Sequence, residues 1–408
     1  MKVDLATVAI SINPIASDDV INAEEKGTDL VLSGSTTNVE ENQTVTITFG
    51  GKSYTATVDA DGNWTATVPS ADLGSLKDGD ASVQVSVTNA HGNTGSSSLD
   101  FTIDAQLPGL RIDTVAGDDV INVIEHAQNL IVSGTSTDLA AGSAVTVTIN
   151  GKAYSATVLA DGSWQAAVPA ADVSQWADGS LDIKASALDA SGNPVAIGTV
   201  VDVDLAPVAI TISSVTDDNV LNAAEKGQDL VLSGTSSNVE AGQTVTVTLN
   251  GVDYTTTVQA NGSWSVTVPS ADLSGITDGN YTISAAVSDK AGNPASADRD
   301  VLVDTTVPQL TIHTVSDDDV INSAEHAQAL IVTGSVTGAA AGDVVTVTLN
   351  GKSYTATLDA SGNWSVGVPA ADVTALAAGD YTITAALTDK AGNSTSASHT
   401  VNVESVLP

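Results

Sequence analysis

One tryptophan recurs every 100 residues in this chain of 408 residues. Its four copies are Trp64, Trp164, Trp264 and Trp364, each within the same pattern, Gly-x-x-Tyr-(x)9-Trp-(x)4-Pro-x-Ala-Asp. The chain is therefore four copies of one unit, and about 100 residues is an ordinary size for a self-sufficient domain. Such a period is too long for a helical solenoid and favours a row of separate domains. The expected domains are 1–104, 105–204, 205–304 and 305–408.

Short β-strand signals dominate each copy. Thr alternates with Val or Ile through residues 44–48, which gives one apolar and one polar face. Asn150-Gly151 is a strong hairpin signal, and Ser70–Leu73 predicts a single helical turn. The strands expected in the first copy are Val8–Ile12, Asp29–Ser35, Thr44–Phe49, Lys52–Val58, Asn63–Val68, Ala81–Thr88 and Ser97–Ile103. This pattern predicts an all-β chain of four tandem Ig-like seven-stranded β-sandwich domains.

The composition excludes several classes of protein. The chain has 49 acidic and 12 basic residues, a formal net charge of −37, and should repel nucleic acid and anionic lipid surfaces. It contains no Cys, so no disulfide supports the fold. It has no run of about 20 apolar residues that could span a bilayer. Met1-Lys2-Val3-Asp4 lacks the apolar region of a signal peptide. We expect an excised segment of a longer protein, without direct membrane contact.

Short linkers join the copies. The last strand ends in an acid, and a proline follows the first three of these acids within four residues. The acids are Asp104, Asp204, Asp304 and Glu404, and the prolines are Pro108, Pro207 and Pro308. Linkers this short that contain proline do not behave as flexible coils. We therefore expect an extended, monomeric rod in which each repeat has its neighbours in the chain as partners.

An acidic loop between the first two expected strands recurs in every copy. In the first copy it reads Asp18-Asp19-Val20-Ile21-Asn22-x-x-Glu25. Asp18, Asn22 and Glu25 have counterparts in all four copies, and position 19 is Asp, Asp, Asn and Asp. The recurrence of the whole pattern indicates a chemical constraint on the loop. The alternative interpretation is that its Asp and Asn residues merely form turns.

The topology of an Ig-like sandwich predicts what lies near this loop. The loop and the end of the last strand share one pole, so we expect Asp18 to lie close to Asp104. The next domain enters at this pole and brings its own loop, Asp189-x-x-Gly192-Asn193. Carboxylates from two domains would meet there, and without a cation they would repel one another. A ligand set made only of oxygen atoms favours Ca²⁺ over Zn²⁺ or Cu²⁺.

Other kinds of site find little support. No His recurs in all four copies, so no acid–base pair or Ser-His-Asp arrangement repeats, and we expect no enzyme. Aromatic residues are 3% of the chain, which is few for a glycan-binding surface. The recurrent Trp and Trp176 are expected in the core. Asp59-x-Asp61-Gly62 is expected to be a hairpin turn, because its counterparts vary.

The period, the Asp-Asp-x-Ile-Asn-x-x-Glu loop, the Asp-x-x-Gly-Asn loop and the Asp…Pro linker resemble the bacterial Ig-like repeats of giant RTX adhesins. The resemblance covers essentially the whole chain. It implies an extender region of a biofilm, ice or host adhesin, between a membrane-retained N-terminal region and C-terminal ligand-binding domains. It also implies type I secretion and an extracellular, cell-surface location, anchored at the bacterial outer membrane. Calcium at the domain junctions would stiffen the rod.

The resemblance also implies the ligands of these calcium ions. The first junction would use Asp18, Asp19, Asn22, Glu25, Asp104 and Asp189. The second would use Asp118, Asp119, Asn122, Glu125, Asp204 and Asp289. The third would use Asp217, Asp218, Asn222, Glu225, Asp304 and Asp389. The fourth repeat would offer Asp317, Asp318, Asn322, Glu325 and Glu404. The alternative function is a multivalent binder, in which each repeat holds a glycan or a surface ligand.

Overall fold

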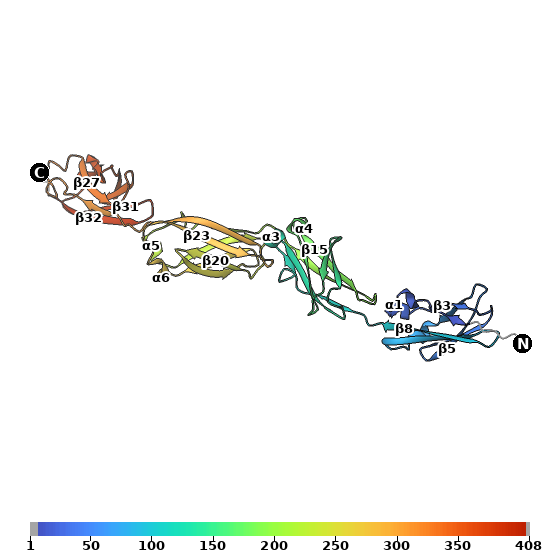
Figure 1. The fold of residues 1–408 in the computed structure, drawn as a ribbon. Coiled ribbons are helices and arrows are strands. Elements are labelled where there is room, and N and C mark those ends of the chain that lie inside the picture. Colours follow the sequence, from blue (N-terminus) through green and yellow to red (C-terminus); the bar gives the residue numbers. More distant parts are fainter. Residues whose placement is uncertain (1–6, 405–408) are drawn as a thin grey trace. The chain divides into compact units, whose positions relative to one another are not determined.

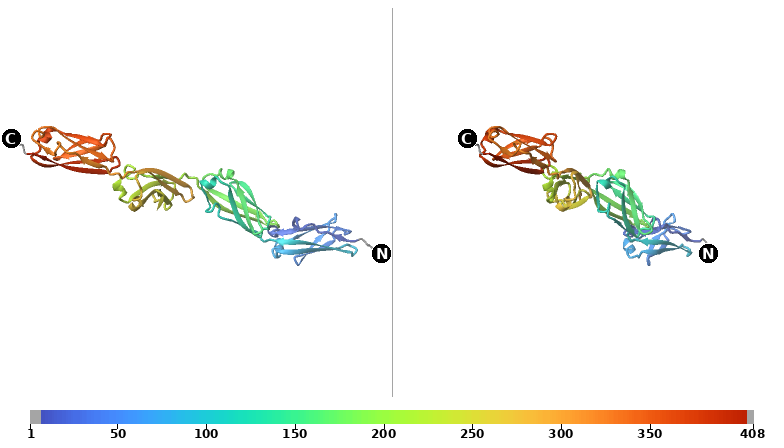
Figure 2. Two further views of the ribbon diagram at one scale, coloured as in Figure 1. Left: turned by 60° about the vertical axis from the view of Figure 1, so that its left-hand side comes forward. Right: turned by 90° about the vertical axis from the view of Figure 1, so that its left-hand side faces the viewer.

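The computed structural model describes residues 7–404 and shows each repeat as a sandwich of two β-sheets (Figure 1). The two layers of the sandwiches can be followed in two further orientations (Figure 2). The chain divides into two compact units, Met1–Leu205 and Ala206–Pro408, and each unit contains two sandwiches. The first four residues, which bear on the question of a leader peptide, lie outside the described residues.

The first unit contains repeats one and two. The elements of repeat one are β1 (Ala9–Ile10), η1 (Ile15–Ser17), β2 (Val20–Asn22), α1 (Ala23–Lys26), β3 (Leu30–Thr37), β4 (Thr44–Phe49), β5 (Lys52–Thr57), β6 (Asn63–Val68), α2 (Ser70–Leu73), β7 (Gly79–Thr88) and β8 (Thr94–Asp104). Those of repeat two are β9 (Gly109–Ile112), β10 (Val120–Ile121), α3 (Val123–His126), β11 (Leu130–Thr137), β12 (Ala144–Ile149), β13 (Lys152–Thr157), β14 (Ser163–Val168), α4 (Ala170–Val173), β15 (Gly179–Leu188) and β16 (Pro194–Val203).

The second unit contains repeats three and four. The elements of repeat three are β17 (Ala209–Ile212), β18 (Val220–Leu221), α5 (Ala223–Lys226), β19 (Leu230–Ser237), β20 (Thr244–Leu249), β21 (Val252–Thr257), β22 (Ser263–Val268), α6 (Ser270–Leu273), β23 (Gly279–Ser288) and β24 (Pro294–Val303). Those of repeat four are β25 (Gln309–Ile312), β26 (Val320–Ile321), β27 (Leu330–Thr337), β28 (Val344–Leu349), β29 (Lys352–Thr357), β30 (Asn363–Val368), α7 (Ala370–Thr374), β31 (Gly379–Thr388) and β32 (Ser394–Val403).

All four repeats have the same strand order. In repeat one the smaller sheet has the order β1-β3-β6 and the larger sheet has the order β2-β8-β7-β4-β5. Alternation follows the sequence, because β4 buries every second side chain and exposes the others. The all-β, Ig-like sandwich predicted from the strand signals is therefore confirmed.

The structure adds an eighth, short strand to the seven expected ones. β2 pairs in parallel with β8, whereas the other strand pairs of this repeat are antiparallel. It has only three residues and buries only Ile21, so no alternation could show in the sequence. β1 is shorter than expected, since only Ala9 and Ile10 pair with β3.

Each repeat has its own core around the recurrent Trp. The buried apolar side chains form four separate clusters, one in each repeat. Trp64 is 1% exposed, and Trp176 also lies in a core, as predicted. Trp64 packs directly over Gly34, where an added Cβ would lie 2.0 Å from the carbonyl oxygen of Ser11. A side chain at position 34 would therefore clash with the backbone as well as with the indole.

The predicted helical turn is held by a polar contact. α2 follows Pro69 and buries Leu73. The Tyr54 hydroxyl donates to Asp72 Oδ2 at 2.7 Å, and Lys52 Nζ lies 2.5 Å from Asp72 Oδ1. Burial, followed by the bond to Asp72, raises the pKa of Tyr54 to about 12. The contact ties the turn to the β4–β5 hairpin.

Candidate functional site

The acidic loop makes local hydrogen bonds to its own backbone. Asp18 Oδ1 accepts the N–H of Val20 at 3.1 Å, and Asp19 Oδ1 accepts the N–H of Ile15 at 2.8 Å. Asp19 has a left-handed backbone, with φ of 64°, a conformation that Asp and Asn adopt more readily than most residues. Asp118, Asp218 and Asp318 repeat the first bond, and Asp119 and Asp319 repeat the second.

Position 19 needs an acceptor rather than a charge. In the third repeat Asn219 takes this position and accepts the N–H of Val215 at 3.0 Å, with the same left-handed φ of 64°. Arg299 Nη1 also donates to its Oδ1. In the fourth repeat His399 Nε2 lies 2.5 Å from Asp319 Oδ1. This contact, followed by the Val315 N–H, holds the pKa of Asp319 below its usual range.

The end of the loop motif is a helix-capping box. Asn22 Oδ1 accepts the N–H of Glu25 at 3.0 Å, and Glu25 Oε2 accepts the N–H of Asn22 at 3.0 Å. Asn122 and Asn222 form the same box with Glu125 and Glu225. Asn322 and Glu325 make the same two bonds, although the residues that follow form turns instead of a helix. Asn-x-x-Glu before a helical turn is a recognisable capping signal, although no helix was expected at this position.

The strand register decides which loop residues reach the pole of the domain. In the β2–β8 pair, Asn22 lies beside Asp104 and Val20 lies beside Thr102. Asp18 lies in the turn that precedes β2 and not in the strand itself. It lines a shallow hollow on the side of the sandwich with Asp80 and Asp100. Asn22, and not Asp18 as expected, is thus the loop residue beside Asp104.

A loop of the second repeat closes the pole of the first. This loop joins β15 to β16 and contains Asp189, Ser191 and Asn193. Asn193 Oδ1 accepts the N–H of Ala23 at 2.8 Å, and Asn193 Nδ2 donates to the carbonyl oxygen of Asp104 at 2.9 Å. Ser191 Oγ donates to Asp104 Oδ2 at 2.7 Å. The contact between these two regions, expected from the topology, is therefore present in the first unit.

Asp189 holds the shape of the contacting loop through hydrogen bonds within its own domain. Its Oδ1 accepts the backbone N–H groups of Ser191 and Asn193, and its Oδ2 accepts Asn193 Nδ2 at 2.9 Å. Both oxygens therefore act within its own domain and orient the side-chain amide of Asn193, which is 1% exposed.

The second unit contains the same contact. Asn393 Oδ1 accepts the N–H of Ala223 at 2.8 Å, and its Nδ2 donates to the carbonyl oxygen of Asp304 at 2.9 Å. Asp389 accepts the N–H of Asn393, as Asp189 does for Asn193. Asp289 and Asn293 form the same loop within repeat three. The second expected junction, with Asp204, falls between the two units and stays a prediction.

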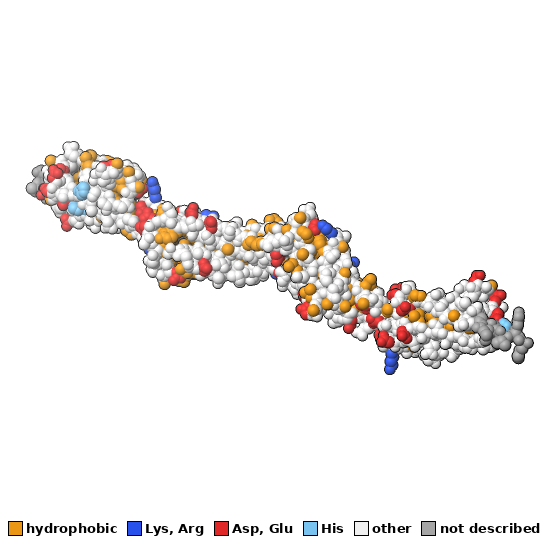
Figure 3. All heavy atoms as spheres, in the orientation of Figure 1, with side chains coloured by type: hydrophobic (Ala, Val, Ile, Leu, Met, Phe, Trp, Pro, Cys, Tyr) orange, Lys and Arg blue, Asp and Glu red, His pale blue; other side chains and the backbone are white. Residues whose placement is uncertain are grey.

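The donor chemistry of these poles fits Ca²⁺, while the clustering of side chains is loose. Glu25 and Asp104 offer carboxylate oxygens, and Asn22 offers an amide oxygen, which are the atoms that calcium prefers. Within residues 7–404 no three His, Cys, Asp or Glu side chains gather as a metal site. Acidic side chains are numerous and basic ones sparse on the face drawn in Figure 3. Calcium binding by the expected ligands stays a prediction.

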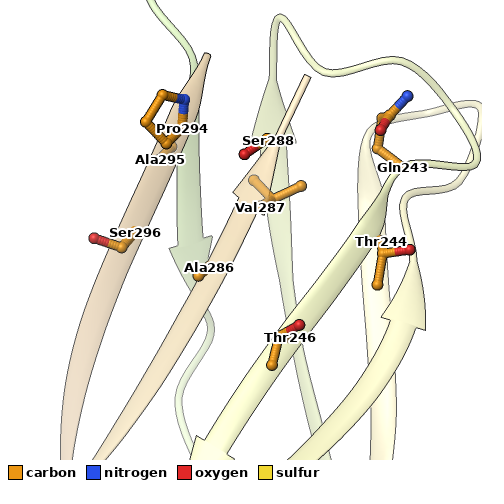
Figure 4. A pocket seen from close by; sticks show the side chains of 9 residues that line it. All are labelled: Gln243, Thr244, Thr246, Ala286, Val287, Ser288, Pro294, Ala295 and Ser296. Atoms are coloured by element: carbon orange, nitrogen blue, oxygen red, sulfur yellow. The ribbon is translucent and has the colours of Figure 1, made fainter. Parts of the chain in front are cut away.

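The hollow that recurs over the larger sheet of repeats one to three lacks the aromatic side chains of a glycan-binding surface. A shallow depression in the third repeat lies over β20, β23 and β24 (Figure 4). It is lined by small or uncharged side chains, namely Gln243, Thr244, Thr246, Ala286, Val287, Ser288, Pro294, Ala295 and Ser296. Similar depressions in repeats one and two also lack an aromatic side chain.

The expected hairpin turn at Asp59 is present, since Asp59 Oδ1 accepts the N–H groups of Asp61 and Asn63.

No helix within residues 7–404 is long and apolar enough to cross a membrane. The longest, α7, has five residues.

Comparison with known proteins identifies a family. Three segments, residues 16–105, 213–305 and 306–405, match the family model described as bacterial Ig-like domain. Repeat two lies outside these segments, although its strand order is the same as in the other repeats. A search of curated proteins finds no significant match.

Several solved structures of adhesin segments are similar in sequence. One, described as a Ca²⁺-stabilized adhesin that helps an Antarctic bacterium reach out and bind ice, is 36% identical, with 98% of this chain and 100% of that chain covered and a TM-score of 0.39. A tetra-tandem repeat in the extending region of a large adhesion protein is 30% identical, with coverage of 98% and 100% and a TM-score of 0.39. A bacterial immunoglobulin-like domain from the M. primoryensis ice-binding adhesin is 38% identical, with coverage of 24% and 96% and a TM-score of 0.20.

Proposed function

Because the chain belongs to the family of bacterial Ig-like domains, we propose that its four repeats are an extender segment of a large bacterial cell-surface adhesin. In this role the repeats set how far, and in which direction, the ligand-binding region of the adhesin lies from the cell surface. A distal region of the adhesin binds the ligand. The segment performs no catalysis of its own. Its location is extracellular, after export by the type I route that the resemblance to RTX adhesins implies.

The contact of Asn193 with the pole of repeat one carries this proposal. It joins the end of one sandwich to a loop of the next through Ala23 and Asp104, and Asn393 does the same in the second unit. A repeat whose long strands span roughly 33 Å at ~3.3 Å per residue, with its loops, is about 40 Å long. Four repeats joined pole to pole would reach about 160 Å.

Calcium would stiffen these poles. The ion would be held by the expected acidic-loop and linker residues, of which Asn22, Glu25 and Asp104 lie nearest the end of the sheet. It would supply positive charge where carboxylates of the chain otherwise repel one another. An affinity of roughly 10⁻⁴–10⁻³ M, typical of extracellular modules, suits a site that loads after export.

Sedimentation velocity and calcium titration calorimetry test the proposal. The chain should sediment as an elongated monomer, since its charge of −37 opposes self-association, and it should bind calcium and not a panel of glycans. A compact particle would contradict the extender role. Saturable binding of a glycan by each repeat would favour the multivalent-binder alternative. If the calorimeter records no heat of binding for calcium, the metal is removed from the proposal.

A further inference from the structure

At the end of the larger sheet of repeat one, two backbone groups, one donor and one acceptor, find their partners in the next repeat. β2 and β8 run in parallel and end with the paired residues Asn22 and Asp104. Beyond this pair lie the backbone N–H of Ala23 and the carbonyl oxygen of Asp104. Their partners are the two polar ends of one side chain, the amide of Asn193. The amide thus fills the place that a peptide group would take between two strands.

Only a carboxamide can make this bridge. Asn carries an acceptor and two donors on one side chain, whereas Asp lacks the donors and Ser has a single oxygen. Asp at position 193 would also add a carboxylate between Asp104 and Asp189. Asp189 uses its Oδ2 to accept from Asn193 Nδ2, which fixes the direction of the amide.

Gly192 provides the left-handed backbone conformation that the loop needs before Asn193. Its φ of 86° lies in the left-handed region, and an added Cβ would lie 3.5 Å from Asn22 Nδ2. At the equivalent Gly392 the distance to Asn222 Nδ2 would be 2.9 Å, which is too short for a Cβ contact. The two residues therefore act together, since Gly192 supplies the left-handed turn and Asn193 makes the hydrogen bonds.

The two units show which contact is constant. Ala391 replaces Ser191 in the second unit, so a hydroxyl contact to the Asp304 carboxylate cannot form there. The Asn393 bridge keeps the same two partners, with distances of 2.8 and 2.9 Å. The recurring bonds are made by an amide and two backbone groups, and none of these groups is charged.

From these contacts we infer that the Gly-Asn loop is the orientation-determining element of the junction and that it acts without a metal ion. Its partner is the pole of a neighbouring Ig-like repeat, recognised through the N–H after the capping Asn and the last carbonyl oxygen of the final strand. This inference rests on the proposed end-to-end function and deepens it. The bridge sets how two repeats meet, and calcium would add stiffness to an orientation that already exists.

Hydrogen exchange of the full chain tests the inference at two matched junctions. In EDTA the amides of Ala23 and Ala223 should both be protected. Asn193→Ala should speed exchange at Ala23 by at least about fivefold, as expected for one lost hydrogen bond, and leave Ala223 unchanged. Asn393→Ala should do the reverse. Asn193→Asp should weaken protection at Ala23 as well, because the bond to Asp104 is lost. Unchanged exchange in β14 and β15 would show that the variants fold.

Two outcomes would overturn the inference. One is an Ala23 amide that is unprotected in EDTA and protected only in calcium, which would make the metal the orienting element. The other is an Asn193→Ala variant whose Ala23 exchange matches that of the parent chain. Either result leaves the extender function standing, because elongation is measured separately by sedimentation. If the particle is compact while the Ala23 amide is still protected from exchange in EDTA, the result contradicts the extender function alone.

Discussion

Asn22 lies directly beside Asp104, as the last residue pair of two parallel strands that are 82 positions apart in the chain. One partner caps the short helix α1, and the other ends the domain and begins the linker. The pairing joins the acidic loop to the point where the chain leaves the domain and enters the linker. Any force applied along the linker therefore reaches the loop through β8 and its neighbour β2.

Substitution of Asp19 tests the structural role of the loop in the absence of metal. Asp19→Asn should change the free energy of unfolding in EDTA by less than about 0.5 kcal/mol, because Asn219 makes the same backbone bond. Asp19→Ala should cost about 2 kcal/mol, through a left-handed Ala and an unpaired Ile15 N–H. Urea unfolding measures both. Equal losses for the two variants would contradict the acceptor role of position 19.

Removal of the capping box should destabilise one repeat with or without calcium. Asn22→Ala removes the acceptor for the Glu25 N–H and should cost about 1 kcal/mol, the usual value for a lost N-cap. Thermal unfolding in EDTA and in calcium measures the effect. The variant Asn322→Ala provides a control, since the same bonds there precede turns and not a helix. A loss that appears only in calcium would assign Asn22 to the metal rather than to the cap.

The recurrent Trp should be the main stability element of its own repeat. Trp164→Ala should lower the free energy of unfolding of repeat two by about 3–5 kcal/mol, because a large buried side chain leaves a cavity. The side chain of Trp164 is 1% exposed, which supports this magnitude. Differential scanning calorimetry should show one transition shifted and the transitions of distant repeats in place. A uniform shift of all transitions would contradict independent cores.

The contact between His399 and Asp319 predicts acid sensitivity in repeat four. His399, followed by the Val315 N–H, lowers the pKa of Asp319 in the folded state. This contribution is therefore present above the pKa of an unfolded Asp and is lost as the pH falls through the lowered value. His399→Leu, which copies Leu99 of repeat one, should raise the Asp319 pKa in an NMR titration. An unchanged pKa would show that the backbone bond alone sets it.

The sequence predicts the repeats, their sandwich fold and the buried Trp because these depend on periodicity that spans many residues. Strand β2 and helix α1 are too short for periodicity, and α1 is visible only through its Asn-x-x-Glu capping pattern. The contact of the Asp189 loop with Asp104 follows from topology. The role of Asn193 does not, because a side-chain amide that bridges two domains depends on a strand register that no local pattern contains.

Calcium should stabilise the folded chain if the proposed sites exist. An ion that binds only the folded form with a dissociation constant of roughly 10⁻⁴–10⁻³ M adds about 1.4–2.7 kcal/mol at a concentration of ~10 mM. The melting temperature should rise with millimolar Ca²⁺, and less with Mg²⁺, which demands strict octahedral geometry. Asp18→Ala should then bind about one ion fewer if Asp18 is a ligand. Identical melting curves in calcium and EDTA would rule out a stabilising metal.

Small-angle X-ray scattering of the full chain tests the central claim most directly. The extender account predicts a maximum particle dimension near the end-to-end value of about 160 Å in calcium. In EDTA the Asn193 and Asn393 bridges should preserve the way the repeats meet within each unit, while the distribution of distances broadens as the carboxylates repel one another. A maximum dimension far below the end-to-end value in calcium, as four repeats packed side by side would give, would contradict the account.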